Sequence, residues 1–135
     1  MIPLSDLKYE SHVQGWGNMG QNKSIEGNPL TIDAQKFENG FGTHAASETT
    51  YDIGGKYSSF RTSFGLDDES LCSEGVQVEI LGDGNVLAQS PVFQNGKVLT
   101  LTANVQGVQK LTLKAIPHNG IDCTHVDFVN SVLIP

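Results

Sequence analysis

GFGTHAASETTYDIG, residues 40–54, combines two local patterns that together indicate how the chain folds. The first half holds two glycines, a Thr-His pair and small residues, and the second half alternates in character. Glycine lets the backbone take a positive φ angle or approach another group closely. We therefore expect a shaped loop around His44 that leads directly into a strand.

Alternation with a period of two residues continues through much of the chain. It is clearest in residues 58–66, 76–80, 99–105 and 111–115, and it is typical of half-buried strands. Asp-Gly, Asn-Gly and Gly-Gly pairs mark tight turns between these segments. The pattern favours an all-β fold, an antiparallel sandwich or barrel. Residues 12–29 lack the alternation and predict a long ordered loop.

Composition restricts the partners of the chain. Its 135 residues carry 8 Lys plus Arg against 15 Asp plus Glu, for a net charge of -7. Nucleic acid and anionic membrane surfaces attract basic proteins, so we expect neither as a partner. The length fits a single domain, residues 1–135. Residues 1–6 do not resemble a signal peptide, and we expect a module of a longer secreted or cell-surface protein.

Cys72 and Cys123 are the two cysteines, and neither lies in a CxxC motif. They predict either one disulfide between two loops, as an extracytoplasmic module can carry, or two separate thiols. A disulfide requires a defined Cα separation, which a sequence does not provide. Both interpretations stay open at this level.

Trp16 is the single tryptophan and lies between two glycines in the segment QGWGN. An indole ring combines a large apolar area with one N–H donor. Trp16 therefore either folds back over a sheet edge or presents its ring to a ligand. The apolar C–H face of a sugar would stack on such a ring.

Residues 118–128, HNGIDCTHVDF, form a second polar cluster besides His44. Imidazole, amide and carboxylate groups can bracket adjacent hydroxyls with paired hydrogen bonds. Metal binding is another possibility, but a zinc site would need a third nitrogen or sulfur donor beside Asp122 and His125. The candidate polar ligand contacts are His44, Asn119, Asp122 and His125.

The acidic run Asp67-Asp68-Glu69 follows the strand expected at residues 58–66. It predicts a solvated turn, a calcium site assembled from separate segments, or carboxylates for glycoside hydrolysis. Adjacent residues on a strand point to opposite faces, which disfavours Asp67 and Asp68 as a catalytic pair. The sequence contains no GxSxG, P-loop or HExxH motif.

Taken in order, short motifs along the chain resemble the NPCBM-type carbohydrate-binding modules, which are family fifty-one of the carbohydrate-binding modules. The matching segments are residues 4–8, 15–17, 42–45, 47–48, 51–57, 65–69, 82–84 and 125–128. The resemblance implies an antiparallel β-sandwich of the jelly-roll, galactose-binding-domain-like type. It also implies a non-catalytic module that binds galactose or galactose-bearing glycans and targets an attached enzyme or a cell-surface protein to them.

The same resemblance implies site residues and a cofactor. Trp16, His44 and the loop of residues 118–125 would contact the sugar, and a structural Ca²⁺ would be bound. The candidate calcium ligands are Asp6, Asp67, Asp68 and Asp127. Two other functions are the alternatives: a structural or protein-interaction sandwich that binds no sugar, and a small glycosidase that uses the acidic turn.

Overall fold

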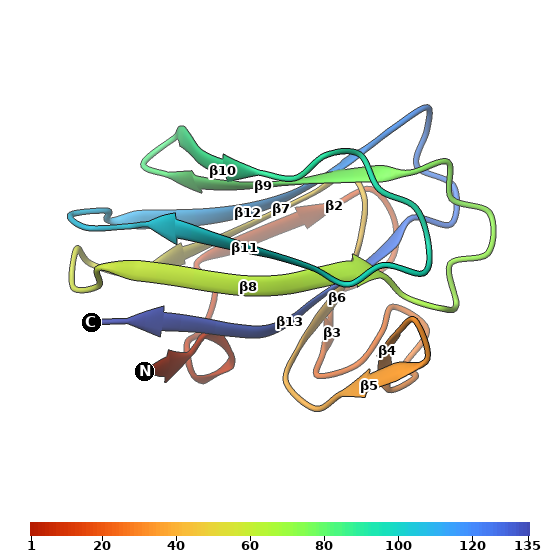
Figure 1. Ribbon diagram of the computed structural model, residues 1–135, viewed down its shortest axis with the longest axis horizontal. Coiled ribbons are helices and arrows are strands. Elements are labelled where there is room, and N and C mark those ends of the chain that lie inside the picture. The colour runs from red at the N-terminus through yellow and green to blue at the C-terminus, as the bar shows by residue number, and fades with distance from the viewer.

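Two antiparallel sheets pack face to face in the computed structural model, which describes residues 1–135 (Figure 1). The larger sheet has the strand order β11-β8-β13-β6-β3, and β1 also pairs with β13. Its strands are β1 (Ile2–Pro3), β3 (Gly20–Gln21), β6 (Gly40–His44), β8 (Ser59–Leu66), β11 (Leu99–Asn104) and β13 (His125–Ile134). The all-β antiparallel sandwich is therefore confirmed.

The second sheet has the order β10-β9-β12-β7-β2. Its strands are β2 (Ser11–Gln14), β7 (Ser47–Asp52), β9 (Val76–Gly82), β10 (Asn85–Gln89) and β12 (Lys110–Pro117). A separate hairpin is formed by β4 (Leu30–Ile32) and β5 (Gln35–Phe37), and a single 3-10 turn, η1, spans Leu4–Asp6. No helix in the structure has the length and apolar character needed to cross a lipid bilayer.

Four phenylalanine rings form the centre of the core between the sheets. The centroid of Phe128 lies 5.1 Å from that of Phe41 and 6.1 Å from that of Phe64, which in turn lies 5.6 Å from Phe93. All four side chains are buried. Aromatic pairs at these spacings stabilise a fold beyond the burial of their area. The core therefore fixes β6, β8 and β13 relative to one another.

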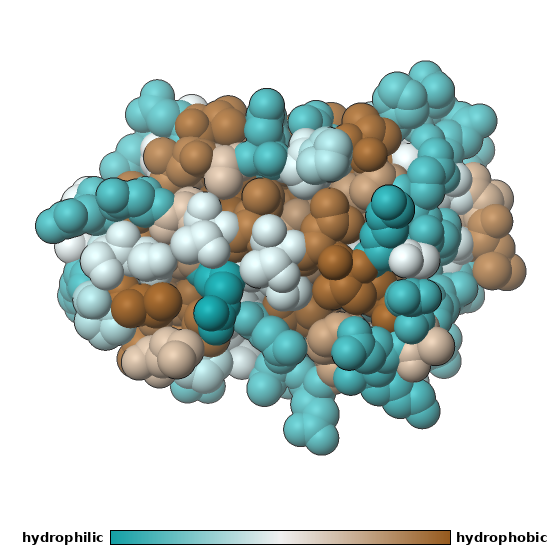
Figure 2. Space-filling view, in the orientation of Figure 1, coloured by the Kyte–Doolittle hydropathy of each residue, from teal (hydrophilic) through white to brown (hydrophobic).

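Burial follows the predicted alternation in β8, β9 and β12, whose inward residues are buried. In β11 the inward residues Leu99 and Leu101 are only partly buried, because β11 is an edge strand of the larger sheet. Val86 in β10 and Val98 next to β11 are exposed hydrophobic residues on this side of the sandwich. Figure 2 shows hydrophobic residues along the middle of that face.

Two local expectations were wrong. Residues Gly40–His44 form a buried strand rather than a loop. A Cβ on Gly40 would lie 2.1 Å from the carbonyl oxygen of Phe128, so glycine there reflects close strand packing. Residues 12–29, expected to form a long loop, include part of β2 and all of β3. The polar cluster of residues 118–128 consists of a loop and the start of β13.

Both chain termini lie at one end of the sandwich, the left of Figure 1. The β8–β9 connection (residues 67–75) and the β12–β13 connection (residues 118–124) lie at the other end. Cys72 and Cys123 form a disulfide between these two connections, with their Cα atoms 5.3 Å apart. The disulfide interpretation is thus the one that the structure supports.

Candidate functional site

His44 and His125 are directly opposite each other on the paired strands β6 and β13. Side chains at paired positions project from the same face of a sheet. Val126 and Phe128, the alternate residues of β13, point into the core, so His125 projects from the outer face. The two imidazole centroids lie 5.2 Å apart. The register of one strand pair therefore brings together two histidines that are far apart in sequence.

Trp16 projects from the connection between β2 and β3, and its ring centroid lies 5.7 Å from that of His44. The side chain is 62% exposed, so its ring is presented at the surface rather than buried. Gly15 allows this approach, because a Cβ there would lie 2.7 Å from the carbonyl oxygen of Ala45. An exposed aromatic ring thus stands beside the histidine pair.

An open pocket of about 330 Å³ lies between these side chains. It is lined by Gly15, Trp16, His44, Ile121, Asp122, Cys123 and His125. Four of the five predicted contacts therefore come together. The fifth does not, because Asn119 lines a neighbouring hollow on the far side of Asp122. This pocket, called the indole pocket below, has the size of a small-ligand site.

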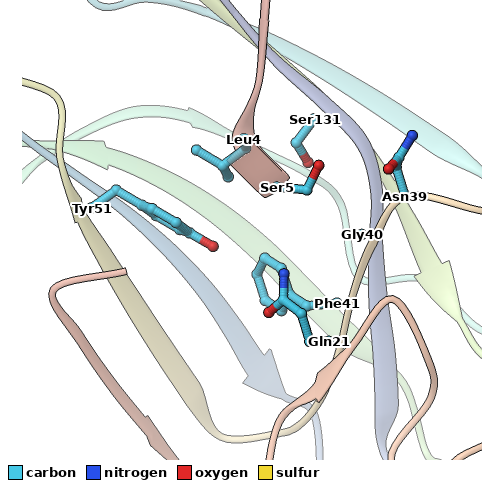
Figure 3. A pocket seen from close by; sticks show the side chains of 8 residues that line it. All are labelled: Leu4, Ser5, Gln21, Asn39, Gly40, Phe41, Tyr51 and Ser131. Carbon is cyan, nitrogen blue, oxygen red and sulfur yellow. The ribbon is translucent and has the colours of Figure 1, made fainter. Parts of the chain in front are cut away.

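A second cavity, between η1 and the ends of β6 and β13, is a poor candidate. It is lined by Leu4, Ser5, Gln21, Asn39, Gly40, Phe41, Tyr51 and Ser131 (Figure 3). Its volume is about 10 Å³, which is room for about one water molecule. Burial raises the pKa of Tyr51, with a smaller contribution from Tyr9, to about 12, so this phenol stays neutral.

Hydrogen bonds determine which nitrogen of each histidine carries a proton. The Nδ1 of His44 lies 2.7 Å from the carbonyl oxygen of Ala45, and the Nδ1 of His125 lies 2.7 Å from Oε2 of Glu69. Because a carbonyl and a carboxylate only accept, each Nδ1–H must be the donor. In the neutral imidazoles, Nε2 is then left as an acceptor for a ligand hydroxyl.

Glu69 is a partner of the site that sequence reasoning missed. Its side chain is 8% exposed, and it accepts hydrogen bonds from His125, Ser24 Oγ, Asn28 Nδ2 at 3.1 Å and Glu26 N at 3.2 Å. Burial alone would raise the pKa of Glu69, but these hydrogen bonds outweigh it and hold the pKa below its ordinary value. The ionised carboxylate therefore holds the His125 ring and residues 24–28 together.

The predicted acidic cluster is only partly assembled. Asp67 and Asp127 are both buried, and Asp67 accepts from the backbone N–H groups of Thr31 at 3.1 Å and Glu69 at 3.0 Å. Neither carboxyl oxygen of Asp127 has a hydrogen-bond partner. Burial, then Asp67 and Glu69 nearby, raise the pKa of Asp127 to about 11. Asp127 is therefore the one buried carboxyl group whose oxygens both lack a hydrogen-bond partner.

Two predicted calcium ligands do not belong to this cluster. Asp68 points away from it, and its two oxygens accept from the N–H groups of Asp33 at 2.9 Å and Ala34 at 2.8 Å. It thereby stabilises the β4–β5 turn, whose residues both have positive φ angles. Asp6 is exposed in η1, beside the end of β13 opposite to His125. Both assignments are therefore corrected.

Fold and pocket together define a β-sandwich module with an open small-ligand pocket beside an exposed indole ring and two histidines. The sequence profile of the NPCBM/NEW2 domain family matches residues 1–134, and the chain belongs to this family. The resemblance found from the short motifs is thereby confirmed. Family members of this kind supply the sugar-binding modules of glycoside hydrolases, and carbohydrate binding is the function that fits the chain.

Solved structures and a curated relative agree with this assignment. CBM51 from Clostridium perfringens GH95, in complex with methyl-galactose, has a TM-score of 0.88 at 25% identity, covering 98% of each chain. CBM51-2 of Clostridium perfringens ZmpB, in complex with GlcNAc, has a TM-score of 0.89 at 25% identity, covering 98% of this chain and 31% of that chain. A Renibacterium salmoninarum protein with the name "Putative endo-alpha-N-acetylgalactosaminidase" is 33% identical over 107 residues, which are 74% of this chain and 7% of that protein.

Proposed function

We propose that the indole pocket binds the terminal ring of a neutral glycan, with galactose as the preferred sugar. The observation that carries this proposal is the exposed Trp16 ring, with its centroid 5.7 Å from that of His44. It lies beside two histidines whose Nδ1–H groups are engaged, so that their Nε2 atoms are left as acceptors. The indole stacks on the apolar face of the ring, and the histidines accept hydrogen bonds from its hydroxyls. Asp122 offers a further acceptor at the pocket edge.

The choice of sugar draws on the solved relatives. One CBM51 structure holds methyl-galactose and another holds GlcNAc, and both are 25% identical to this chain. Two acceptors side by side suit two neighbouring hydroxyls of one pyranose ring. N-acetylglucosamine is therefore the second sugar to test.

Binding without catalysis is part of the proposal. Glycoside hydrolysis needs two carboxyl groups that flank the scissile bond. Asp122 is the single carboxylate that lines the indole pocket. Glu69 lies behind His125, where four hydrogen-bond donors already engage it, so it does not serve as the second carboxylate. We expect no release of nitrophenol from nitrophenyl galactosides. Turnover that is lost in Asp122→Asn would instead favour the glycosidase alternative.

We further propose that the chain works as one module of a longer secreted or cell-surface protein. It spans 7% of the curated relative and 31% of one solved neighbour, so such modules occur within larger chains. The disulfide supports an oxidising compartment. In that setting the module would hold an attached enzyme or surface protein on glycans.

Substituting Trp16 by Ala tests the sugar site. We expect the parent protein to bind galactose with a dissociation constant on the order of 10 µM to 1 mM. Loss of indole stacking should weaken this affinity about tenfold or more, because aromatic contacts contribute about 0.5–1.5 kcal/mol beyond the area they bury. Titration calorimetry measures the change. Thermal stability should stay constant, because the ring is 62% exposed.

Val86→Ala is the matched control, since Val86 is an exposed apolar residue in β10, remote from the pocket. Equal galactose affinity in Trp16→Ala and the parent would remove the stacking role. A folded protein that binds nothing on a glycan array would favour the structural or protein-interaction alternative.

We also propose a structural calcium ion at Asp67 and Asp127. The unpartnered buried oxygens of Asp127 support it, because hard cations take carboxylate oxygens as ligands. The ion would compensate the two adjacent charges and hold the β8–β9 connection against β13. A proton on Asp127 is the competing way to relieve the same repulsion.

Removal of calcium distinguishes a bound calcium ion from a proton on Asp127. The melting temperature of the parent protein should be roughly 5–10 °C lower in chelator than in calcium at about a hundred times the dissociation constant of the ion. Asp127→Asn removes a charged ligand but keeps the shape, so its melting temperature should respond to neither calcium nor chelator. A parent protein with the same melting temperature in both conditions would show that Asp127 holds a proton instead.

A further inference from the structure

A second hollow adjoins the indole pocket on the far side of Asp122. It is lined by Cys72, Glu74, Asn119, Gly120 and Asp122, and its volume is about 220 Å³. Asp122 lines both hollows, and the two halves of the disulfide line one each. This volume is smaller than the roughly 330 Å³ of the indole pocket and is on the scale of a single sugar ring.

We propose that this hollow is a second sugar subsite, so that the module recognises a neutral oligosaccharide of at least two rings. The proposal rests on the proposed function, because the first ring must occupy the indole pocket. The glycan would cross over Asp122, which borders both spaces. Asn119 would then contact the second sugar ring, whereas the sequence predicted that it contacts the same ring as Trp16.

The polar groups around the second hollow are free to bind a ligand. The side chains of Glu74, Asn119 and Asp122 are exposed, and none of them has a hydrogen-bond partner within the protein. The amide of Asn119 offers donors and acceptors, and the two carboxylates offer acceptors. This combination suits the hydroxyl groups of a sugar, which both donate and accept.

The backbone around the hollow is held in place although these side chains are free. The disulfide joins the two walls, and His118 N donates to the carbonyl oxygen of Gly75 at 3.0 Å. Asn95 Nδ2 also donates to the carbonyl oxygen of Ser70 at 2.8 Å. A ligand therefore meets a pre-ordered surface, and less entropy is lost on binding.

Charge determines the class of sugar that the subsite accepts. No Lys or Arg lines either hollow, whereas Glu74 and Asp122 both carry carboxylates. An anionic ring in the second hollow would face like charges and would be repelled. The subsite is therefore specific for uncharged rings.

The experiment compares the affinities of monosaccharides with those of disaccharides. Galactose, N-acetylglucosamine, lactose and N-acetyllactosamine are titrated into the parent, Asn119→Ala and Glu74→Gln by calorimetry. N-acetyllactosamine contains both rings that the solved relatives hold. We expect a disaccharide to bind the parent about tenfold tighter than its better monosaccharide, which corresponds to one or two net hydrogen bonds. In Asn119→Ala this ratio should fall below about threefold, with monosaccharide affinity unchanged.

Asn85→Ala, an exposed asparagine in β10, is the matched control and should keep the parent's ratio. The side-chain amide signals of Asn119 in NMR spectra should shift with disaccharide and not with monosaccharide. Failure of every monosaccharide to bind would overturn the proposed function. Two other results would overturn the second subsite alone. In the first, monosaccharides bind the parent and disaccharides bind it no more tightly. In the second, disaccharides bind more tightly and Asn119→Ala keeps that difference in affinity.

A sulfated probe tests the charge argument. N-acetyllactosamine with a 6-sulfate on its N-acetylglucosamine ring should bind the parent at least threefold more weakly than the unsulfated sugar. Glu74→Gln removes one like charge, so the difference in affinity between the sulfated and the unsulfated sugar should become smaller. Equal affinity of both sugars for the parent would contradict the assignment of the second ring to this acidic hollow.

Discussion

Removal of the Cys72–Cys123 disulfide is expected to lower the free energy of unfolding by about 4 kcal/mol. The bond closes a loop between residues 51 positions apart, and a cross-link over such a distance strongly restricts the unfolded chain. Sugar affinity should fall as well, because Ile121, Asp122 and Cys123 line the indole pocket. The loop that carries them would lose its covalent tie to the β8–β9 connection.

Urea unfolding of the double variant Cys72→Ser/Cys123→Ser against the parent measures this effect. The slope of the unfolding free energy with urea must be compared too, since an open chain exposes more surface on unfolding. A reducing agent should destabilise the parent and leave the double variant unchanged, which is the control. Three hydrogen bonds between the two connections remain after reduction. They join Ser70 Oγ to the carbonyl oxygen of Cys123, Ser73 Oγ to Thr124 Oγ1 at 3.3 Å, and His118 N to the carbonyl oxygen of Gly75 at 3.0 Å. A loss below about 1 kcal/mol would mean that these contacts alone hold the loop.

The architecture could be predicted from sequence because its signal is local. Alternation in residues 58–66, 76–80 and 111–115 directly reports strands with one buried face, and all three appear as such. Strand β6 could not be found this way, because the segment Lys23–Ser24 covers its outer face and all its residues are buried. A strand buried on both faces loses its alternation, and glycines that allow close packing then resemble loop glycines.

The site was predictable in its residue types and less so in its geometry. Trp16, His44 and His125 were singled out by chemistry, and the pairing of β6 with β13 brings the two histidines together. Asn119 was misplaced because a shared loop does not determine which hollow a side chain enters. Asp68 was misassigned because a carboxylate that stabilises a distant turn has the same sequence signature as a metal ligand.

Glu69 shows most directly why partners of a site escape sequence reasoning. It lies in the acidic turn and in one of the short family motifs, residues 65–69, which was the available signal. Its partners Ser24, Asn28 and His125 are distant in the chain and meet it only in the folded protein. The residue type alone therefore could not separate a solvated acid from a structural acceptor.

Substituting Glu69 by Ala is expected to destabilise the fold by about 3 kcal/mol and to weaken galactose binding about tenfold. Four donors lose their acceptor, and those of Ser24 and His125 are buried. A buried polar group without a partner costs about 1–3 kcal/mol, and a hydrogen bond to a charged group contributes about 1.5–3 kcal/mol. The His125 ring would also lose the contact that keeps its proton on Nδ1, so Nε2 would no longer be a fixed acceptor for the sugar.

Nitrogen NMR of the imidazoles separates this positioning role from a general loss of stability. The parent should show His125 as the Nδ1–H tautomer, and Glu69→Ala should show a mixture of tautomers at a temperature where it is still folded. Glu69→Gln keeps one oxygen that can accept from His125, so it should recover most of the sugar affinity. Glu79→Ala, a change in β9 of an acid without side-chain hydrogen bonds, is the matched control. Unchanged galactose affinity in folded Glu69→Ala would mean that His125 reaches the sugar without help from Glu69.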